Sequence, residues 1–390
     1  MGEGPRAVPP LDTGVPVLLL RLGPGPLPRE ALGVVRSLGR AGIEVHAVAA
    51  CAGGPVGRSR HLHRMHLRPT GPPAPAALLD LLRDLSEGLG RPAVLLPVDA
   101  PAALAAAPLA GRLLGRYLLP GPLGRLTDPA ELALLCRELG LPHPATAVPT
   151  GPRQAAEAAA GLGLPLVALW RHPWLRPPPA GLPGSTVVHT PDDARRLYER
   201  AERAGGGLLL RRPPPAGRDT DRFFHGCFAR GGRCLIGGSG RTGRGRPWTG
   251  PATTGSRLPH PEVESAALRL AAHLGHRGLL DLDFRRDADG RHHLLGAGVG
   301  PGTRFRLFTD PSSGLDAIRA LHLDLTGRTV PPVPGTPGPR PRPDTSRGCP
   351  APPDDAARTP PPPSARPFAA PHGTPRGVPP APAPGPLPRP

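Results

Sequence analysis

The chain has 390 residues and a formal net charge of +18, and all 48 of its basic Lys+Arg positions are arginine. Proline accounts for 63 residues, glycine for 53 and aromatic residues for only 3%. Nucleic-acid binders combine positive charge with aromatic side chains that stack on bases. The charge alone therefore does not indicate such a function in a chain this biased towards arginine, alanine, glycine and proline. The five cysteines are scattered without a CxxC pair, which argues against a disulfide framework and favours a reducing compartment.

No signal-like pattern opens the sequence, and the apolar run "VPVLLLRL" (15–22) is too short to span a bilayer. We therefore expect a soluble cytoplasmic protein. The same run is one of three predicted strands in the first hundred residues, with 43–50 and 92–100. Helices are predicted between them, at 29–42 and 74–90. Alternation at this spacing predicts a parallel sheet with crossover helices.

In the middle of the chain, helix caps and turn signals mark the ends of the predicted elements. A helix is predicted within 127–144, where Asp128 is the expected N-cap and Glu131 follows three residues later, as in a capping box. Strands are predicted at 163–170 and 207–212, with a helix between them at 190–205. A hairpin follows at 221–241, turning at Gly231-Gly232, and then a helix at 260–275.

The segment "LLDLDFRRDADGRHHLL" (279–295) predicts a second hairpin whose first strand carries two carboxylates. Side chains alternate between the faces of a strand, so Asp281 and Asp283 lie on one face, opposite Leu280, Leu282 and Phe284. Asp289-Gly290 is the turn signal. Magnesium binds to one or two carboxylates together with substrate phosphate oxygens, so this hairpin is a candidate Mg²⁺ platform.

The glycine string "GAGVGPG" (296–302) follows this hairpin. A GxGxxG dinucleotide fingerprint would need glycine at position 301, which is proline, and would need a parallel strand that opens into a helix. A Walker A loop requires lysine, which this chain lacks. The string is therefore not a predicted phosphate cradle.

From about residue 331 the chain loses its apolar periodicity and becomes rich in proline and arginine. Such a composition cannot bury enough surface to offset its ordering entropy, so residues 331–390 are predicted to be disordered and locally polyproline-like.

Five segments, taken in order, resemble ATP-grasp proteins, and most closely carboxylate–amine ligases of the D-aspartate ligase kind. They are "VLLPVDAPAALAA", "LTDPAELALLCRELGLPHPAT", "FFHGCFARGGRCLIGGSGRTGR", "GHRGLLDLDFRRDADGRHHLL" and "RLFTDPSSGLDAIRALHLDLTGR". The resemblance runs from about Val15 to Gly327. It implies an α/β fold, α+β in the ATP-binding part: an N-terminal Rossmann-like domain at 12–122 and an ATP-grasp domain at 123–330. Within the latter, a small lid subdomain would span about 163–212 and a larger one 213–330.

The resemblance also implies ATP and Mg²⁺ as cofactors, with small-molecule carboxylate and amine substrates joined through an acylphosphate. In the metal hairpin Asp283 matches the first acid, and Asp281 lies on the same face. The second metal motif, Glu-x-Asn-Pro-Arg in the family, aligns here on Gly296, Gly298 and Gly300. The side chains of that motif are therefore missing.

The nucleotide-binding positions also differ from the family pattern. Leu169 stands where the family has a lysine, with Arg171 two residues on as a candidate substitute. Arg211 and Arg212 stand at the hinge strand in place of the acids that grip adenine. Arg241 and Arg244 match a basic stretch expected to contact phosphates or the substrate carboxylate, and arginine suits either anion.

Two further clusters have weaker interpretations. His61, His63 and His66 have a spacing compatible with a metal ion, but no carboxylate or cysteine is near them in the sequence. Cys227 and Cys234 are expected to face each other across the first hairpin as reduced thiols.

Three functions remain open from the sequence. The first is an active ATP-dependent carboxylate–amine ligase. The second is a catalytically degenerate ATP-grasp protein, a pseudoenzyme with a binding or scaffolding role that could involve a protein partner. The third is a binder of nucleic acid or acidic surfaces, which the scarcity of aromatic residues disfavours. No membrane partner is expected, and a homodimer is possible.

Overall fold

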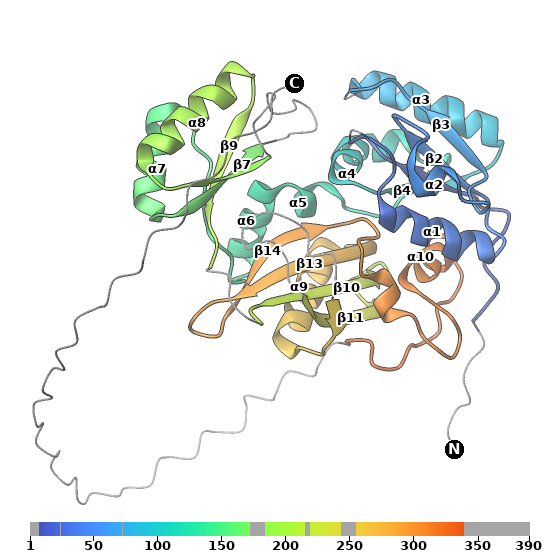
Figure 1. Cartoon of the computed structure of the whole chain (residues 1–390). Helices are drawn as coiled ribbons and strands as arrows, with labels where there is room; N and C mark the ends of the chain where they lie inside the picture. Colours follow the sequence, from blue (N-terminus) through green and yellow to red (C-terminus); the bar gives the residue numbers. More distant parts are fainter. Residues whose placement is uncertain are drawn as a thin grey trace, which may run out of the picture. The chain divides into compact units, whose positions relative to one another are not determined.

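The computed structural model describes residues 8–23, 25–71, 73–171, 184–214, 219–242 and 255–338. Within them the chain forms three sheets, which Figure 1 shows with their covering helices. The predicted strands and helices all appear, with their ends shifted by a few residues.

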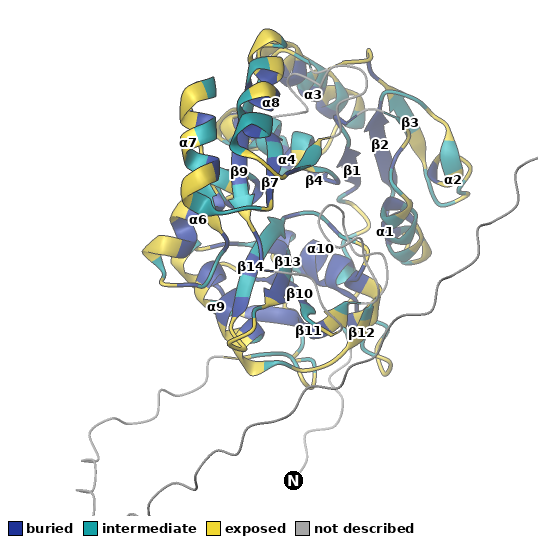
Figure 2. Ribbon diagram, turned by 60° about the vertical axis from the view of Figure 1, so that its left-hand side comes forward, coloured by how far each residue is buried: buried dark blue, intermediate teal, exposed yellow. Residues whose placement is uncertain are grey.

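The N-terminal sheet is parallel and has the strand order β3-β2-β1-β4-β5. Its strands are β1 (Val17–Leu20), β2 (Val45–Ala49), β3 (Arg64–Leu67), β4 (Ala93–Pro97) and β5 (Tyr117–Leu118). The helices of this part are α1 (Arg29–Arg40), α2 (Gly54–Gly57), α3 (Pro75–Leu89) and α4 (Ala100–Ala106), followed by the 3-10 helix η1 (Ala107–Leu113). Figure 2 shows β1 and β2 buried throughout, as expected for central strands covered on both faces.

Asp99 fixes the loop after β1 at the carboxyl end of this sheet. Its carboxylate accepts a hydrogen bond from the backbone N–H of Ala102, which caps α4. It also accepts from the N–H groups of Leu22 and Gly23. One carboxylate therefore holds the loops that follow β1 and β4.

A small antiparallel sheet follows, with the strand order β6-β9-β7-β8. Its strands are β6 (Ala145–Ala147), β7 (Leu166–Arg171), β8 (Ser185–Val188) and β9 (Gly207–Arg212). Two short helices precede it, α5 (Gly124–Thr127) and α6 (Pro129–Glu138), and Asp128 caps α6 as predicted. Helices α7 (Pro152–Leu162) and α8 (Pro191–Arg203) pack on the sheet around a core of their own. A capping box between Thr190 and Asp193 starts α8.

The large sheet is antiparallel and has the strand order β12-β11-β10-β13-β14. Its strands are β10 (Asp221–Phe228), β11 (Cys234–Thr242), β12 (Gly255–Arg257), β13 (Gly278–Arg286) and β14 (His292–Gly298). The remaining helices are α9 (Pro261–Leu274), the 3-10 helix η2 (Phe305–Phe308) and α10 (Ala317–Leu325). Both predicted hairpin turns form, with positive φ at Gly231, Gly232 and Gly290.

The two faces of the large sheet have different neighbours. Leu280, Leu282 and Phe284 pack with residues of α9, whereas Phe223 and Cys227 pack with residues of α10 and η2. The predicted alternation of β13 is therefore confirmed. Asp281 and Asp283 point to the face that carries η2.

The prediction that Cys227 and Cys234 face each other is wrong. The bulge after Cys227 shifts the register, so Cys234 pairs with Phe228 and Cys227 pairs with Ile236. The two buried, unoxidised thiols belong to the cores on opposite faces of the sheet.

Part of the predicted tail belongs to the described structure. Val333 packs against the core, and Arg257 donates a hydrogen bond from Nη2 to the carbonyl of Gly335 at 3.3 Å. Residues 339–390 lie outside the described residues. None of the described helices is both long and apolar enough to cross a membrane.

Candidate functional site

The two strand carboxylates of β13 face glycines on one side and aromatic rings on the other. In the register with β14, Asp283 pairs with Gly296 and Asp281 with Gly298. In the register with β10, Asp283 pairs with Phe223 and Asp281 with His225. The sheet thus places both acids on one face, and β14 adds no polar side chain opposite them.

A buried arginine binds both carboxylates. Arg304, which directly precedes η2, donates from Nη2 to Oδ1 of Asp283 at 2.7 Å and from Nη1 to Oδ1 of Asp281 at 3.3 Å. Its guanidinium lies over the ring of Phe223, 4.5 Å from the centroid, and its side chain is only 4% exposed. A ring face stabilises a desolvated cation, so this arginine is held by the ring as well as by the two acids.

His225 completes the cluster. It is fully buried, and its Nδ1 lies 3.4 Å from Oδ1 of Asp281, where the N–H of the imidazole donates to the carboxylate. Its ring stacks on Phe308 of η2. His225, Asp281, Arg304 and Asp283 therefore form one connected polar group, which we call the Arg304 cluster.

The two carboxylates differ in their acidity. Burial disfavours the charge of Asp281, but the hydrogen bond from His225 and the positive charge of Arg304 outweigh it and hold the pKa below its ordinary value. For Asp283, whose side chain is 43% exposed, partial removal of the carboxyl group from water raises the pKa above its ordinary value, and the neighbouring charge of Asp281 adds to this, against the attraction of Arg304. Asp281 is thus the firmly ionised member of the pair.

The residues of the Arg304 cluster do not fit Mg²⁺. A magnesium ion requires carboxylate oxygens that are free to coordinate it in near-octahedral geometry. Here Oδ1 of each acid already accepts from the guanidinium, and Gly296 supplies no third carboxylate. The positive charge that two strand carboxylates require is supplied by the protein itself.

The glycine string shapes this cluster through close backbone approach. A Cβ atom on Gly302, which has φ +58°, would lie 2.6 Å from Oδ2 of Asp281. A Cβ on Gly300 would lie 3.1 Å from the carbonyl oxygen of Pro97 in β4, whereas one on Gly296 would meet nothing within 4 Å. Positions 300 and 302 are therefore sterically constrained, and position 296 has room for a side chain.

Arg241, one of the two predicted phosphate-contacting arginines, is not brought to the carboxylates. Arg241 pairs with Arg222 across the hairpin, and Arg222 pairs with Phe284, so Arg241 projects on the opposite face of the sheet from Asp283. Its Nη1 lies 3.6 Å from Oδ1 of Asp219, and its side chain is half exposed. Arg244 lies outside the described residues.

The arginines of the small sheet lie at the carboxyl ends of its strands β7 and β9. Arg211 of β9 donates to the carbonyl of Leu295 in β14 and so connects the small sheet to the large one. Burial, with some repulsion from Arg285, lowers the pKa of Arg211 to about 10. Arg212 is exposed and donates to the carbonyl of Leu162 at 3.1 Å. Arg171 ends β7, where it pairs with Gly207.

Sequence reasoning found Asp281 and Asp283 but missed Arg304 and His225. Arg304 is one of many arginines in the chain, and nothing in its local sequence distinguishes it from the exposed Arg306 two residues later. His225 follows "FF" in a strand-like run. In such a run a histidine is as often a core residue without a function as it is part of a site. The signal lay in the pairing of strands, which the sequence does not display.

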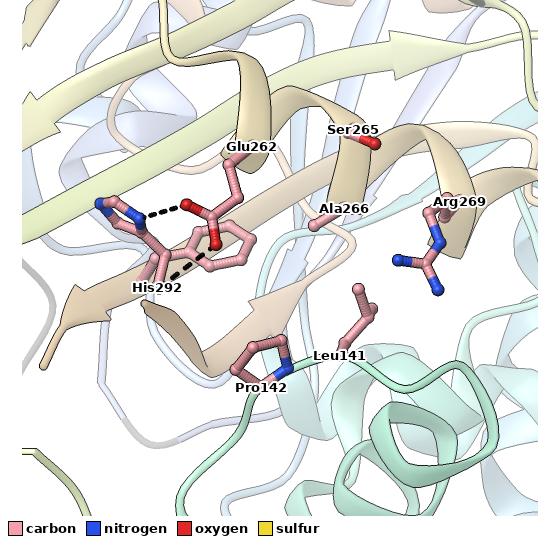
Figure 3. A pocket seen from close by; sticks show the side chains of 8 residues that line it. Leu141, Pro142, Glu262, Ser265, Ala266, Arg269 and His292 are labelled. Atoms are coloured by element: carbon pink, nitrogen blue, oxygen red, sulfur yellow. Dashed lines mark hydrogen bonds and ion pairs between the residues drawn. The ribbon is translucent and has the colours of Figure 1, made fainter. Parts of the chain in front are cut away.

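A small pocket lies on the α9 side of the large sheet, away from Asp281 and Asp283. It encloses about 150 Å³ and is shown in Figure 3. At its edge Glu262 accepts a hydrogen bond from Nδ1 of His292 at 2.8 Å. The other residues lining it are Leu141, Pro142, Ser265, Ala266, Arg269 and Phe284.

A parallel N-terminal sheet followed by a small and a large antiparallel sheet defines an ATP-grasp fold, and comparison with solved structures supports this assignment. N5-carboxyaminoimidazole synthetase from Staphylococcus aureus, solved with ADP, matches 83% of this chain over 80% of its own, with TM-score 0.60 and 11% identity. N5-carboxyaminoimidazole ribonucleotide synthetase from Thermus thermophilus matches 81% of this chain over 79% of its own, with TM-score 0.59 and 17% identity. L-amino acid ligase from Bacillus licheniformis matches 80% over 74%, with TM-score 0.55 and 16% identity.

No protein-family model and no curated protein matches the sequence. The ATP-grasp fold expected from the resemblance is nevertheless confirmed, because these structures align over about four fifths of the chain.

Proposed function

We propose that the protein is a catalytically degenerate ATP-grasp protein with a binding or scaffolding role. The observation that carries this proposal is the Arg304 cluster. A guanidinium bound to Asp281 and Asp283 already forms ion pairs with the carboxylates that would otherwise hold a metal ion.

ATP chemistry requires positive charge beside the phosphates. Transfer of a phosphoryl group depends on metal ions that neutralise developing negative charge between the phosphates. A buried, ion-paired arginine has no open coordination positions to offer phosphate oxygens. Its charge is compensated by the protein, so it does not replace the metal in that role.

The changes at the nucleotide positions support the same proposal. Arg211 contacts the backbone of β14 between the two sheets, where the resemblance implies adenine. Leu169 replaces the expected lysine, and it pairs with Ser185 and Leu209 inside the small sheet.

The second candidate is an active ATP-dependent carboxylate–amine ligase that acts on small molecules. Two observations favour it: the similar structures are a synthetase solved with ADP and an L-amino acid ligase. If this candidate is right, cations other than the family lysine and the metal ions of the expected motifs must bind the phosphates of ATP.

The test uses the full chain. We expect no Mg²⁺-dependent heat when ATP is titrated into it, and no ADP release above background across a panel of carboxylic acids and amines. Turnover that Asp283→Asn abolishes, and that Asp289→Asn in the exposed hairpin turn leaves intact, would establish the ligase and overturn the proposal.

A further inference from the structure

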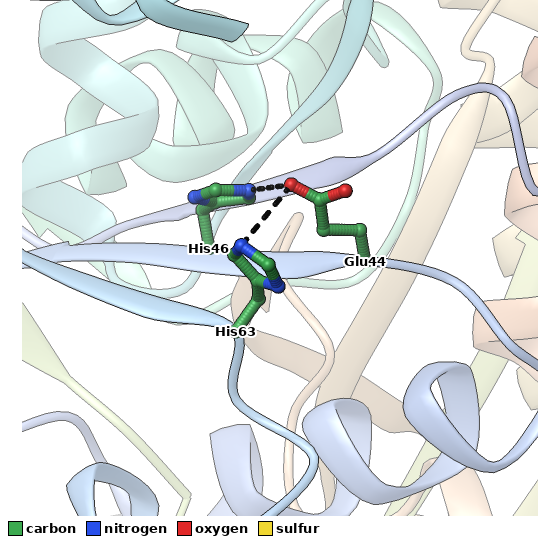
Figure 4. Close-up of side chains that lie close together, drawn as sticks. All are labelled: Glu44, His46 and His63. Atoms are coloured by element: carbon green, nitrogen blue, oxygen red, sulfur yellow. Dashed lines mark hydrogen bonds and ion pairs between the residues drawn. The ribbon is translucent and has the colours of Figure 1, made fainter.

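Histidines singled out in the sequence are joined in the fold by two residues from a neighbouring strand. Figure 4 shows His63, which directly precedes β3, beside Glu44, which directly precedes β2, and His46 of β2. The pairing is fixed by the backbone, because the N–H of His63 donates to the carbonyl of Val45 at 2.8 Å. His66 joins from β3. His61 does not, since its Cβ instead packs close to Gly39 of α1.

Three donor atoms converge in this group. Oε1 of Glu44 lies 2.6 Å from Nε2 of His46 and 3.6 Å from Nε2 of His63. One ligand atom from each residue lies within 4.8 Å of the others. The second carboxylate oxygen of Glu44 is bound by Arg91, which leaves Oε1 as the oxygen directed towards the histidines.

A hydrogen bond to His66 orients the ring of His46. It is buried, and its Nδ1 lies 3.1 Å from Nε2 of His66. Histidine ligands in metal sites characteristically bond their second ring nitrogen to another polar group, which fixes the tautomer and the direction of the coordinating nitrogen. In the metal-free chain the Nε2–H of His46 donates to Oε1 of Glu44 at 2.6 Å, and Nδ1 of His46 accepts from Nε2–H of His66 at 3.1 Å. A bound metal ion would take the place of the Nε2 proton, and the Nδ1–H tautomer of His46 would then donate to His66.

Two imidazoles and one carboxylate form a common ligand set of protein-bound zinc, with water at the fourth position. At bond lengths of about 2.0–2.2 Å, two ligands of a tetrahedral ion are separated by roughly 3.3 Å. The Glu44–His63 separation is already close to this value. The Glu44–His46 separation needs to widen by less than about 1 Å to reach this tetrahedral value, which a small rotation of the glutamate side chain provides.

We propose that Glu44, His46 and His63 bind one divalent transition-metal ion of the Zn²⁺ type, with His66 as a positioning residue. The site lies at the amino-terminal ends of β2 and β3, whereas Gly300, beside the Arg304 cluster, approaches Pro97 at the carboxyl end of β4. The metal is therefore separate from the Arg304 cluster. It fastens the edge strand β3 to β2 and stabilises the N-terminal sheet.

The test is a titration of the metal-free full chain with Zn²⁺ by calorimetry, and with Co²⁺ by visible absorption, which reports tetrahedral coordination. We expect one site. Glu44→Gln and His63→Ala should each weaken Zn²⁺ binding at least about tenfold, and Zn²⁺ should raise the melting temperature of the unmodified chain. His189→Ala, at an exposed histidine of the small sheet, is the matched control and should leave the affinity unchanged.

A second group, His260, Glu262 and His292, is the alternative place where the chain could bind the metal ion. If His260→Ala abolishes the strongest zinc site while Glu44→Gln and His63→Ala do not affect it, the proposal is overturned. It is also overturned if the unmodified chain, shown to be folded by circular dichroism, takes up no Zn²⁺ at all. Because Glu44 and His63 are partly exposed, both variants are expected to fold.

Discussion

Arg304 and Asp283 are joined by a hydrogen-bonded ion pair of 2.7 Å, although 21 residues separate them in the chain. The arginine is buried and the aspartate is 43% exposed, so the pair lies at the boundary between core and solvent. Asp281 accepts from the other Nη atom of the same guanidinium. The guanidinium thus reduces the repulsion between two carboxylates that lie on the same face of one strand.

Removing Arg304 should destabilise the fold more than removing a neighbouring arginine. Arg304→Gln leaves two adjacent carboxylates without their cation, and we expect a loss of about 3 kcal/mol in the free energy of unfolding. Arg306→Gln, at an exposed position, should change it by less than about 0.5 kcal/mol. Urea unfolding of both variants measures the difference, and equal effects would show that the pair contributes little.

A metal site should appear when Arg304 is replaced and a third carboxylate is introduced opposite Asp283. Gly296 lies opposite Asp283 and has open space at its Cβ. In the double variant Gly296→Glu/Arg304→Gln, three carboxylates would converge without a guanidinium between them. We expect millimolar Mg²⁺ to raise its melting temperature.

The unmodified chain and the single variant Gly296→Glu serve as controls, and neither should respond to Mg²⁺. A response of the unmodified chain would contradict the assignment of Arg304 as the cation of this cluster.

Gly302 should be less replaceable than another glycine of the same backbone conformation. Gly302 and Gly290 both have positive φ, but only at Gly302 would a Cβ collide with Asp281. Gly290→Ala should cost about 1 kcal/mol for the left-handed conformation. Gly302→Ala should cost at least about 1 kcal/mol more, because the carboxylate must move. Thermal unfolding compares them, and similar losses would mean that Asp281 is not held in place.

Stability should fall as the solution becomes acidic, in part through His322. This residue of α10 is buried, and its Nε2–H donates to the carbonyl of Val15 at 2.9 Å. Burial lowers its pKa below the ordinary value. The unfolded chain therefore binds the proton more readily, so this contribution is complete above about pH 6.5 and is lost as the pH falls through the lower, folded value.

His322→Gln retains a donor and removes the titration, so the decline of the unfolding free energy between about pH 7 and pH 5 should become shallower. The exposed His189→Gln should leave the decline unchanged. Parallel curves for His322→Gln and the unmodified chain would exclude this histidine as a source of the acid sensitivity.

Local sequence patterns predicted the elements and the orientation of the acids. The apolar run around β1 indicated a strand, and the alternation from Leu280 to Phe284 set which face of β13 carries Asp281 and Asp283. Residues adjacent in the chain determine both features, because side-chain direction in a strand follows a fixed period of two. The cap at Asp128 was visible for the same local reason.

Pairing between strands was decided only in the folded chain. A bulge after Cys227 placed Cys227 and Cys234 on opposite faces, against the expectation from the hairpin. The parallel pairing of β2 and β3 brought Glu44 and His46 to histidines that had no carboxylate near them in the sequence.

The sequence by itself determined the class of fold and the strand that carries the acids. Only the tertiary structure decided that Arg304 binds those acids and that His63 meets Glu44. The physical reason is that a charged side chain finds its partner through space. Many arginines in this chain are locally equivalent, and burial against Asp281, Asp283 and Phe223 makes one of them different.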